Sequence, residues 1–191
     1  WTYWGADVQN TPPGVMPPIM NRSYTITADV TVPSDGSDGV LVGAFDHLGG
    51  FSLFVQDGLL RHTYSFLGID TYRQVSDRPV PSGRHSLQLD FEADSATMAP
   101  GGVITLRIDD EVVGTGRLER TVPIMFSFYA GLDIGRDNGE VVDMSYEHLA
   151  PFPFPGQIHR IDVDVRQPGA QERASLHHAE TAGMHARHIE S

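Results

Sequence analysis

The chain has 191 residues, enough for one domain with its own core, and 40% of them are hydrophobic, which is typical of a globular protein. Its 25 acidic and 13 basic residues give a net charge of −12, which disfavours nucleic acid, anionic lipid and sulfated polysaccharide as partners. No apolar run approaches the ~18 residues of a membrane span, and with no cysteine the sequence excludes disulfides and thiolate metal sites.

Residues 1–20 are rich in proline, and we expect them to form an irregular leader. From residue 21 the pattern changes to that of β-strands, because apolar and polar residues alternate with a period of two over 24–32. Further strands are expected at 40–45, 51–56, 59–66, 71–76, 84–91, 103–108, 111–118, 124–134 and 158–165. The pairs Asp57-Gly58 and Asp109-Asp110 are predicted to form two-residue hairpin loops, and Gly49-Gly50 another turn.

Many short strands with turn signals every 8–12 residues, and no helical period before the end of the chain, predict an all-β fold. We predict a jelly-roll or concanavalin-like sandwich of two antiparallel sheets, spanning residues 21–166. Residues 167–191 lack an apolar face and are expected to be a flexible tail. The tail contains four histidines that could bind a transition metal, although solvated side chains are the simpler interpretation: His177, His178, His185 and His188.

Glycine and aspartate alternate in the stretch GLDIGRDNGEVV, residues 131–142. As an extended strand it would place Asp133 and Asp137 on one face. One interpretation is a calcium site formed by Asp133, Asp137 and either Glu140 or Asp143, since carboxylate oxygens at short spacing suit this ion. A second is a strand that runs into an Asn-Gly turn, with the carboxylates accepting backbone N–H groups or pairing with Arg136. A third is a contact with another domain.

Two aromatic segments, WTYW at 1–4 and PFPFP at 151–155, lie outside the expected strands. An exposed apolar patch marks a contact surface, so we expect these segments to pack on each other or on a neighbouring domain. The residues expected at this domain contact are Trp1, Trp4, Phe152, Phe154 and Arg136.

Two other kinds of site remain open. A sugar-binding face would need exposed aromatic side chains, and those available are Tyr64, Phe66, Tyr72, Phe128 and Tyr129. A glycan-cleaving site would need two carboxylates facing one another, for which the strands offer Asp29, Asp90 and Glu92.

Six segments of the chain resemble, in order, the C-terminal β domain of large bacterial arylsulfatases, especially actinobacterial ones. They are NRSYTITADVTVP (21–33), GVLVGAFDHLGGFSLFVQDGLL (39–60), YSFLG (64–68), GRHSLQLDF (83–91), TLRIDDEVVGTGRLERTVP (105–123) and DIGRDNGEVV (133–142). The resemblance covers about residues 15–165. It implies a non-catalytic accessory domain that packs against, or shapes, the catalytic sulfatase domain of the same polypeptide.

Sulfatases of this family use a formylglycine, made from a Cys/Ser-x-Pro-x-Arg motif, beside a divalent cation. This chain has no cysteine and no such motif, so no catalytic residue is carried over, and we expect neither catalysis nor a cofactor in it. The parent protein is expected to be a soluble bacterial arylsulfatase, cytoplasmic or exported. The alternative to an accessory domain is a carbohydrate-binding module of concanavalin or laminin-G type, with a glycan as its partner.

Overall fold

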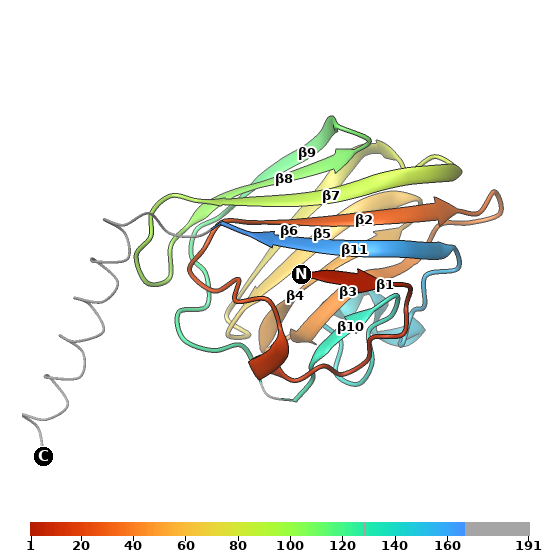
Figure 1. The fold of residues 1–191 in the computed structure, drawn as a ribbon. Coiled ribbons are helices and arrows are strands. Elements are labelled where there is room, and N and C mark those ends of the chain that lie inside the picture. Colours follow the sequence, from red (N-terminus) through yellow and green to blue (C-terminus); the bar gives the residue numbers. More distant parts are fainter. Residues whose placement is uncertain (128, 167–191) are drawn as a thin grey trace, which may run out of the picture.

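The computed structural model describes residues 1–127 and 129–166, which fold into two antiparallel β-sheets packed face to face (Figure 1). The first sheet has six strands, in spatial order β1 (Thr2–Trp4), β11 (Gln157–Val165), β2 (Tyr24–Val32), β7 (Gly83–Ala93), β8 (Gly102–Ile108) and β9 (Glu111–Leu118). The second has five, in the order β10 (Leu132–Ile134), β3 (Gly39–Asp46), β4 (Gly49–Gln56), β5 (Leu59–Phe66) and β6 (Asp70–Pro79). Two short 3-10 helices, η1 (Pro13–Val15) and η2 (Met144–Leu149), lie in the connections. The predicted all-β sandwich is confirmed.

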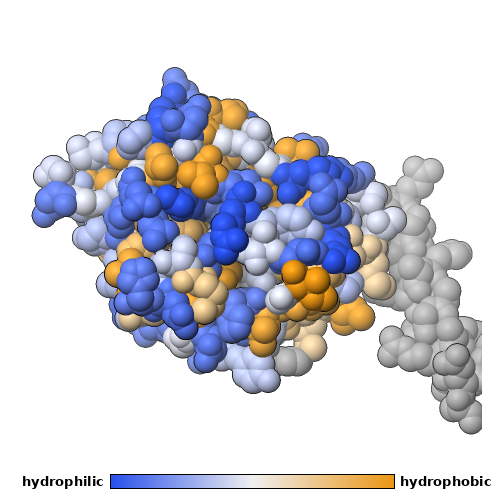
Figure 2. Space-filling view, turned by 180° about the vertical axis from the view of Figure 1, so that it is seen from behind, coloured by the Kyte–Doolittle hydropathy of each residue, from blue (hydrophilic) through white to orange (hydrophobic). Residues whose placement is uncertain are grey.

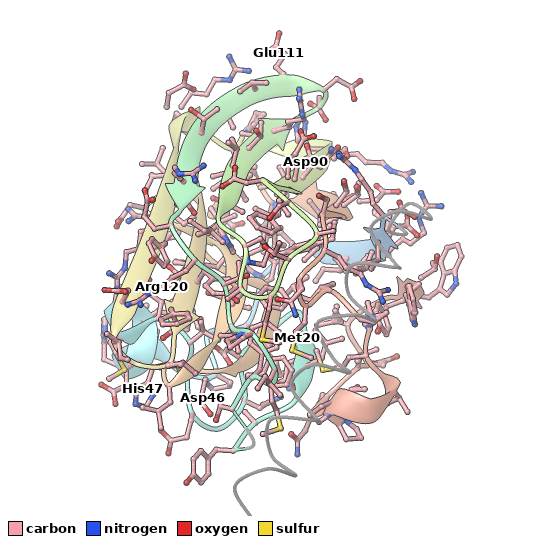
Figure 3. The ribbon with its side chains drawn as sticks, turned by 90° about the vertical axis from the view of Figure 1, so that its left-hand side faces the viewer. Met20, Asp46, His47, Asp90, Glu111 and Arg120 are labelled. Atoms are coloured by element: carbon pink, nitrogen blue, oxygen red, sulfur yellow. The ribbon has the colours of Figure 1, made fainter. Side chains whose placement is uncertain are left out.

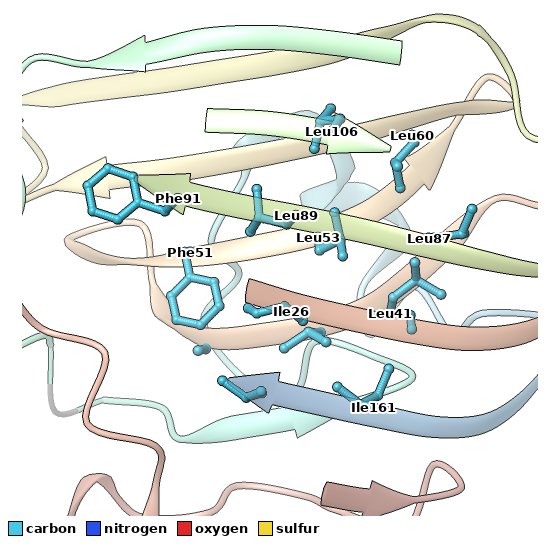
Figure 4. Packing of buried hydrophobic residues seen from close by; sticks show 14 of the residues in the cluster. Ile26, Leu41, Phe51, Leu53, Leu60, Leu87, Leu89, Phe91, Leu106 and Ile161 are labelled. Carbon is cyan, nitrogen blue, oxygen red and sulfur yellow. The ribbon is translucent and has the colours of Figure 1, made fainter. Parts of the chain in front are cut away.

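The core lies between the two sheets. Along β2 the nine residues alternate strictly between buried and half-buried, so one face of this strand lines the core and the other remains accessible. Figure 4 shows Leu87, Leu89 and Phe91 of β7 in the same layer of side chains as Phe51 and Leu53 of β4. Within the described part of the chain, no helix is long and apolar enough to cross a bilayer.

Two of the predicted hairpin loops are confirmed by their backbone angles. Asp57 and Gly58 have φ of 56° and 73°, and Asp109 and Asp110 have φ of 53° and 57°. Positive φ at both central residues gives the turn a twist that matches the flanking strands, which is why Asp and Gly are favoured there.

The expected turn at Gly49-Gly50 is wrong, because both glycines belong to β4 and the turn is formed by His47 and Leu48. A Cβ atom on Gly50 would lie 2.4 Å from the carbonyl oxygen of Ala44. Gly50 therefore serves the close approach of two strands and not a change of direction.

The ends of the chain also differ from the expectation. The leader contains β1, which pairs with β11, and Thr11 forms an antiparallel bridge with Leu132. In the middle of the chain, only β10 forms of the strand expected at 124–134. Phe126 lies in the connection before it, where its ring stacks on that of Phe45 with centroids 4.6 Å apart. The predicted tail and its four histidines lie outside the described residues.

Candidate functional site

A row of polar positions crosses the outer face of the five-stranded sheet. Strand register places Asp133, Gly43, Ser52, Thr63 and Arg73 opposite one another on five successive strands. Residues opposite each other in antiparallel pairs point to the same side of a sheet. This side faces away from the core, since the residues flanking Asp133 on β10 are buried in the core cluster.

Residues 135–152 form a covering segment over part of this face. Its Tyr146 is buried in a second apolar cluster, separate from the main core, together with Val40, Phe54, Val141 and Phe152. The ring of Tyr146 meets that of Phe54 edge-on, with centroids 4.8 Å apart. The covering segment thus seals the β3–β4 side of the sheet, and explains why every residue of β3 is buried.

The glycine-aspartate stretch begins on β10 and continues into the covering segment. β10 ends at Ile134, and Gly135 takes a φ of 78°, so the prediction of one continuous strand face from Gly131 to Gly139 is wrong beyond Ile134. Asp137 instead folds back over Gly43, where a Cβ atom would lie 3.1 Å from the carboxyl carbon of Asp137.

Both aspartates of the stretch are buried and accept hydrogen bonds from the protein. Asp133 accepts from the backbone N–H groups of Asn10 (2.7 Å) and Asn138 (3.0 Å) and from the Asn138 side-chain amide (3.0 Å). Asp137 accepts from the backbone N–H of Val142 (3.1 Å) and the hydroxyl of Tyr146 (2.6 Å). These bonds fix the path of the covering segment.

The pKa of Asp137 is raised to about 6, chiefly by burial and to a smaller extent by the nearby carboxylates of Asp133 and Asp46. The hydrogen bonds from Tyr146 and Val142 oppose this shift.

The geometry offers the calcium hypothesis no support. Glu140 is exposed, whereas Asp133 and Asp137 are buried. Among residues 1–127 and 129–166, no three His, Cys, Asp or Glu side chains converge in a way that could hold a metal ion.

The exposed part of the outer face lies along β6, where Arg73 ends the polar row. Its Nε donates to Asp143 Oδ2 at 2.9 Å and its Nη2 to Oδ1 at 3.3 Å. The Asp143 side chain is 1% exposed, whereas that of Arg73 is 51% exposed. The guanidinium is therefore held from behind by a buried carboxylate and presents its other edge to solvent.

Asp143 is well placed for this role because three groups donate to it. Besides Arg73, these are the hydroxyl of Thr63 (2.5 Å) and the backbone N–H of Ser145 (2.8 Å), which caps η2. Burial acts to raise the pKa of Asp143, but the hydrogen bonds from Arg73, Thr63 and Ser145 outweigh it and hold that pKa below its ordinary value. Asp143 is thus a fixed anion beneath Arg73.

The surroundings of Arg73 are mixed in polarity. Val75, two residues along β6, is exposed on the same face, and Arg61 lies opposite Val75 on β5. The Arg61 guanidinium bonds to Asp57 Oδ2 at 2.8 Å and to the carbonyl of Gln56 at 3.1 Å. Figure 2 shows this side of the molecule, where polar side chains predominate over the middle and apolar patches are separate.

The residues expected at a domain contact do not form one apolar patch. Trp1 and Trp4 are exposed, as expected, but Phe152 is buried in the second cluster and Phe154 in the main core. The Nε of Arg136 is buried and has no hydrogen-bond partner among the described residues, and within these residues the side chain forms no ion pair. The two PFPFP phenylalanines serve packing within the domain.

The aromatic side chains considered for a sugar-binding row are also dispersed. Tyr64 and Phe66 are buried, Tyr72 is half-buried, and Phe128 lies outside the described residues. Tyr129 is exposed in the connection from β9 to β10, and its backbone N–H donates to the hydroxyl of Ser127, which in turn donates to Asp46. Figure 3 shows Asp46 and His47 next to each other at one end of the sandwich.

The carboxylates considered for glycan cleavage lie on the outer face of the six-stranded sheet, each paired with an arginine. Asp29 pairs with Arg84, Asp90 with Arg107, and Glu92 with Arg166. This pairing does not leave the acid and base that a glycosidase needs.

The sequence analysis missed Arg73, and it considered Asp143 only as a possible calcium ligand. The signal present was slight: Asp143 precedes a short helix, a favoured capping position, and Arg73 occupies a polar position of an alternating strand. Nothing local links two residues 70 positions apart.

Comparison with known proteins gives structural neighbours only. No family model matches the sequence, and no curated protein matches it. The chain is similar to the Ruminococcus gnavus IT-sialidase CBM40, with a TM-score of 0.56, 16% identity, and coverage of 87% of this chain and 94% of that one. It also resembles the leech intramolecular trans-sialidase (TM-score 0.58, 13% identity, 90% of this chain and 26% of that one). Domains LG4-5 of mouse laminin α1 give a TM-score of 0.59 at 11% identity, over 88% of this chain and 45% of that one.

These neighbours correct the expected family. The resemblance to an arylsulfatase C-terminal domain is wrong, and with it the accessory role beside a sulfatase domain, because the structural neighbours include a sialidase CBM40 and laminin domains and none of those named points to a sulfatase. The segments that carried the resemblance are alternating strands and Asp-Gly hairpins, which two-sheet sandwiches share for reasons of backbone geometry. At these identities the likeness establishes the fold.

Proposed function

We propose that this protein is a carbohydrate-binding module that holds an acidic sugar at Arg73, on the open part of the five-stranded sheet. The observation that carries the proposal is the half-exposed Arg73 guanidinium, oriented by the buried Asp143. A side chain fixed before the ligand arrives loses little conformational entropy on binding, so its hydrogen bonds contribute more to affinity.

The neighbours support this proposal by their names. One of them is a CBM40 module of a sialidase, and this chain covers 94% of it. The chain spans only 26% of the leech trans-sialidase, so it corresponds to a part of that protein, and no reaction is proposed for it.

The charge of the site favours a single carboxylate over a polyanion. Arg73 donates Nε and Nη2 to Asp143, which leaves the Nη1 edge for a ligand carboxylate. Asp143 already neutralises most of that charge, and the net charge of −12 repels highly charged chains. Val75, exposed on the same face, supplies a small apolar surface for the rest of the sugar.

Isothermal titration with 3′-sialyllactose and with lactose tests the proposal, because the two differ by one acidic sugar. We expect the wild-type protein to bind 3′-sialyllactose more tightly than lactose. Loss of a charge-assisted hydrogen bond costs about 1.5–3 kcal/mol, so Arg73→Gln should weaken 3′-sialyllactose binding about 10- to 100-fold.

Arg78→Gln is the matched control. Arg78 is on the same strand and similarly exposed, but it pairs with the exposed Glu111. Thermal melts of both variants establish that they fold. Equal affinity for the two sugars, or unchanged binding in folded Arg73→Gln, would refute the acidic-sugar site.

A further inference from the structure

The opposite sheet carries a second arrangement of side chains that the proposed site does not use. Trp4 lies on the edge strand β1, directly opposite Arg160 of β11, and its side chain is 70% exposed. The Arg160 guanidinium carbon is 5.8 Å from the centre of the Trp4 ring, within the range of a cation–π contact. Trp4 is thus an exposed aromatic ring held beside a polar group.

Hydrogen-bonding groups flank this ring. Arg160 Nε lies 2.7 Å from Asp162 Oδ2, and Thr2 Oγ1 donates to Asp162 Oδ1 at 2.7 Å. Thr2 and Trp4 alternate with the inward Tyr3, so both face outward with Arg160 and Asp162. One aromatic ring, one hydroxyl, one guanidinium and one carboxylate therefore share a small area of the outer face.

The charges of this area are balanced internally. Arg160 is paired with Asp162, and on the next strand Asp29 accepts two bonds from Arg84, at 3.0 and 2.8 Å. A charged ligand would have to compete with one of these ion pairs. A neutral ligand that carries both donors and acceptors can bond to the outward edges of the same groups and leave the pairs intact.

From this arrangement we infer a second sugar-binding surface, formed by Thr2, Trp4, Arg160 and Asp162, whose ligand is a neutral sugar ring stacked on Trp4. The carbon-bound hydrogens on one side of a pyranose ring form a flat apolar surface of about the size of an indole, and its hydroxyl groups lie around the rim. Trp4 matches the flat surface, and the polar side chains match the rim.

A protein partner fits this surface less well. Stable protein interfaces bury roughly 800 Å² on each partner around an apolar centre. Strand pairing places the polar residues Thr2, Arg160 and Asp162 beside Trp4, so the ring is not the centre of a continuous apolar patch on these strands. With the surface at Arg73 on the other sheet, one domain would hold two glycan segments on opposite sides and could link them.

Tryptophan fluorescence tests the inference directly, because the chain has only two tryptophans, Trp1 and Trp4. The probes are lactose, maltotriose, cellotriose and xylotriose, which carry no charge. We expect at least one of them to change the fluorescence in a saturable way. Trp4→Ala should weaken that binding roughly tenfold, measured by isothermal titration, because the stacking surface is lost.

Three variants make the result specific. Trp1→Ala should keep both the affinity and the fluorescence change, and Trp4→Phe should keep part of the affinity because the stacking ring remains. Arg73→Gln should leave binding of the neutral sugar unchanged, which separates this surface from the proposed acidic-sugar site. No saturable binding of any of the four probes, or binding unaltered by Trp4→Ala, would overturn the inference. Neutral-sugar binding lost in Arg73→Gln would assign it to the other sheet and also overturn it.

Discussion

The guanidinium of Arg73 bonds through two of its nitrogens to the carboxylate of Asp143, and this contact joins the covering segment to the β6 edge of the five-stranded sheet. Asp143 is buried and Arg73 is half-exposed, so one contact both fixes the segment and orients a cation toward solvent. The stability of the covering segment and the geometry of the candidate site therefore depend on the same pair.

Replacing Asp143 should cost stability because Thr63, Ser145 and Arg73 all lose an acceptor. Each buried donor left without a partner costs about 1–3 kcal/mol, and the share of Arg73 is reduced by solvent. We expect Asp143→Ala to lower the free energy of unfolding by about 2–4 kcal/mol in urea titrations. Glu92→Ala, which removes an exposed partner of Arg166, is the control and should stay within about 0.5 kcal/mol of wild type.

The buried His62 should make the protein sensitive to mild acid. Burial lowers its pKa from 6.5 to about 4, while its Nδ1 lies 2.9 Å from the carbonyl of Ser52. The unfolded chain takes up a proton below pH ~6.5 and the native state does not until pH ~4, so stability falls as the pH falls through this window. At about 1.4 kcal/mol per pH unit, the loss is on the order of 3 kcal/mol.

The variant His62→Gln removes this titration. Its free energy of unfolding, measured in urea from pH 7 to pH 4, should fall less steeply with acidification than that of wild type. Parallel profiles for the two proteins would show that His62 is not the group responsible.

Asp137 should have the opposite effect on the pH profile. Its pKa is raised from 3.8 to about 6, so in the native state it keeps its proton where the unfolded chain has lost it. Its contribution to stability is full below pH ~4 and is lost as the pH rises through about 6. Asp137→Asn mimics the protonated form, and we expect it to gain stability relative to wild type between pH 4 and 7, by roughly 2–3 kcal/mol. A constant difference across this range in urea titrations would contradict the assignment.

Phe54 should anchor the second apolar cluster. It is fully buried on the outer face of β4 and meets the ring of Tyr146 edge-on. We expect Phe54→Ala to cost about 3–5 kcal/mol of unfolding free energy and to speed amide hydrogen exchange in residues 135–152. Val112→Ala, at an exposed strand position, is the control and should change little. Unchanged exchange in the segment would show that Phe54 does not hold it.

Millimolar calcium is expected to leave the melting temperature unchanged, because protein N–H groups already occupy both carboxylate oxygens of Asp133. A rise that a chelator reverses and that Asp133→Asn abolishes would revive the calcium hypothesis.

The alternation of residues 24–32 and the pair Asp57-Gly58 predicted a strand and a hairpin that the structure contains, because strand facing and turn twist are decided by neighbouring residues. For the glycine-aspartate stretch, the interpretation in which its carboxylates accept backbone N–H groups agrees with the structure, but the extent of the strand was misread. Periodicity cannot show that β10 ends at Ile134, since the end depends on Gly135 turning and Asp137 packing over Gly43.

Composition and strand periodicity were enough to predict an all-β sandwich with an excess of acidic residues and no cysteine chemistry. Tertiary structure alone decided which side chains meet. Arg73 contacts Asp143, 70 residues later, because the covering segment folds over the five-stranded sheet. Trp4 lies beside Arg160 because β1 and β11, near the two ends of the sequence, pair in one sheet. Local patterns show the period of a strand, whereas a binding surface forms from strands that are distant in the sequence and lie side by side in the fold. The same packing buries Phe152 and Phe154, so they do not form the expected patch with the tryptophans.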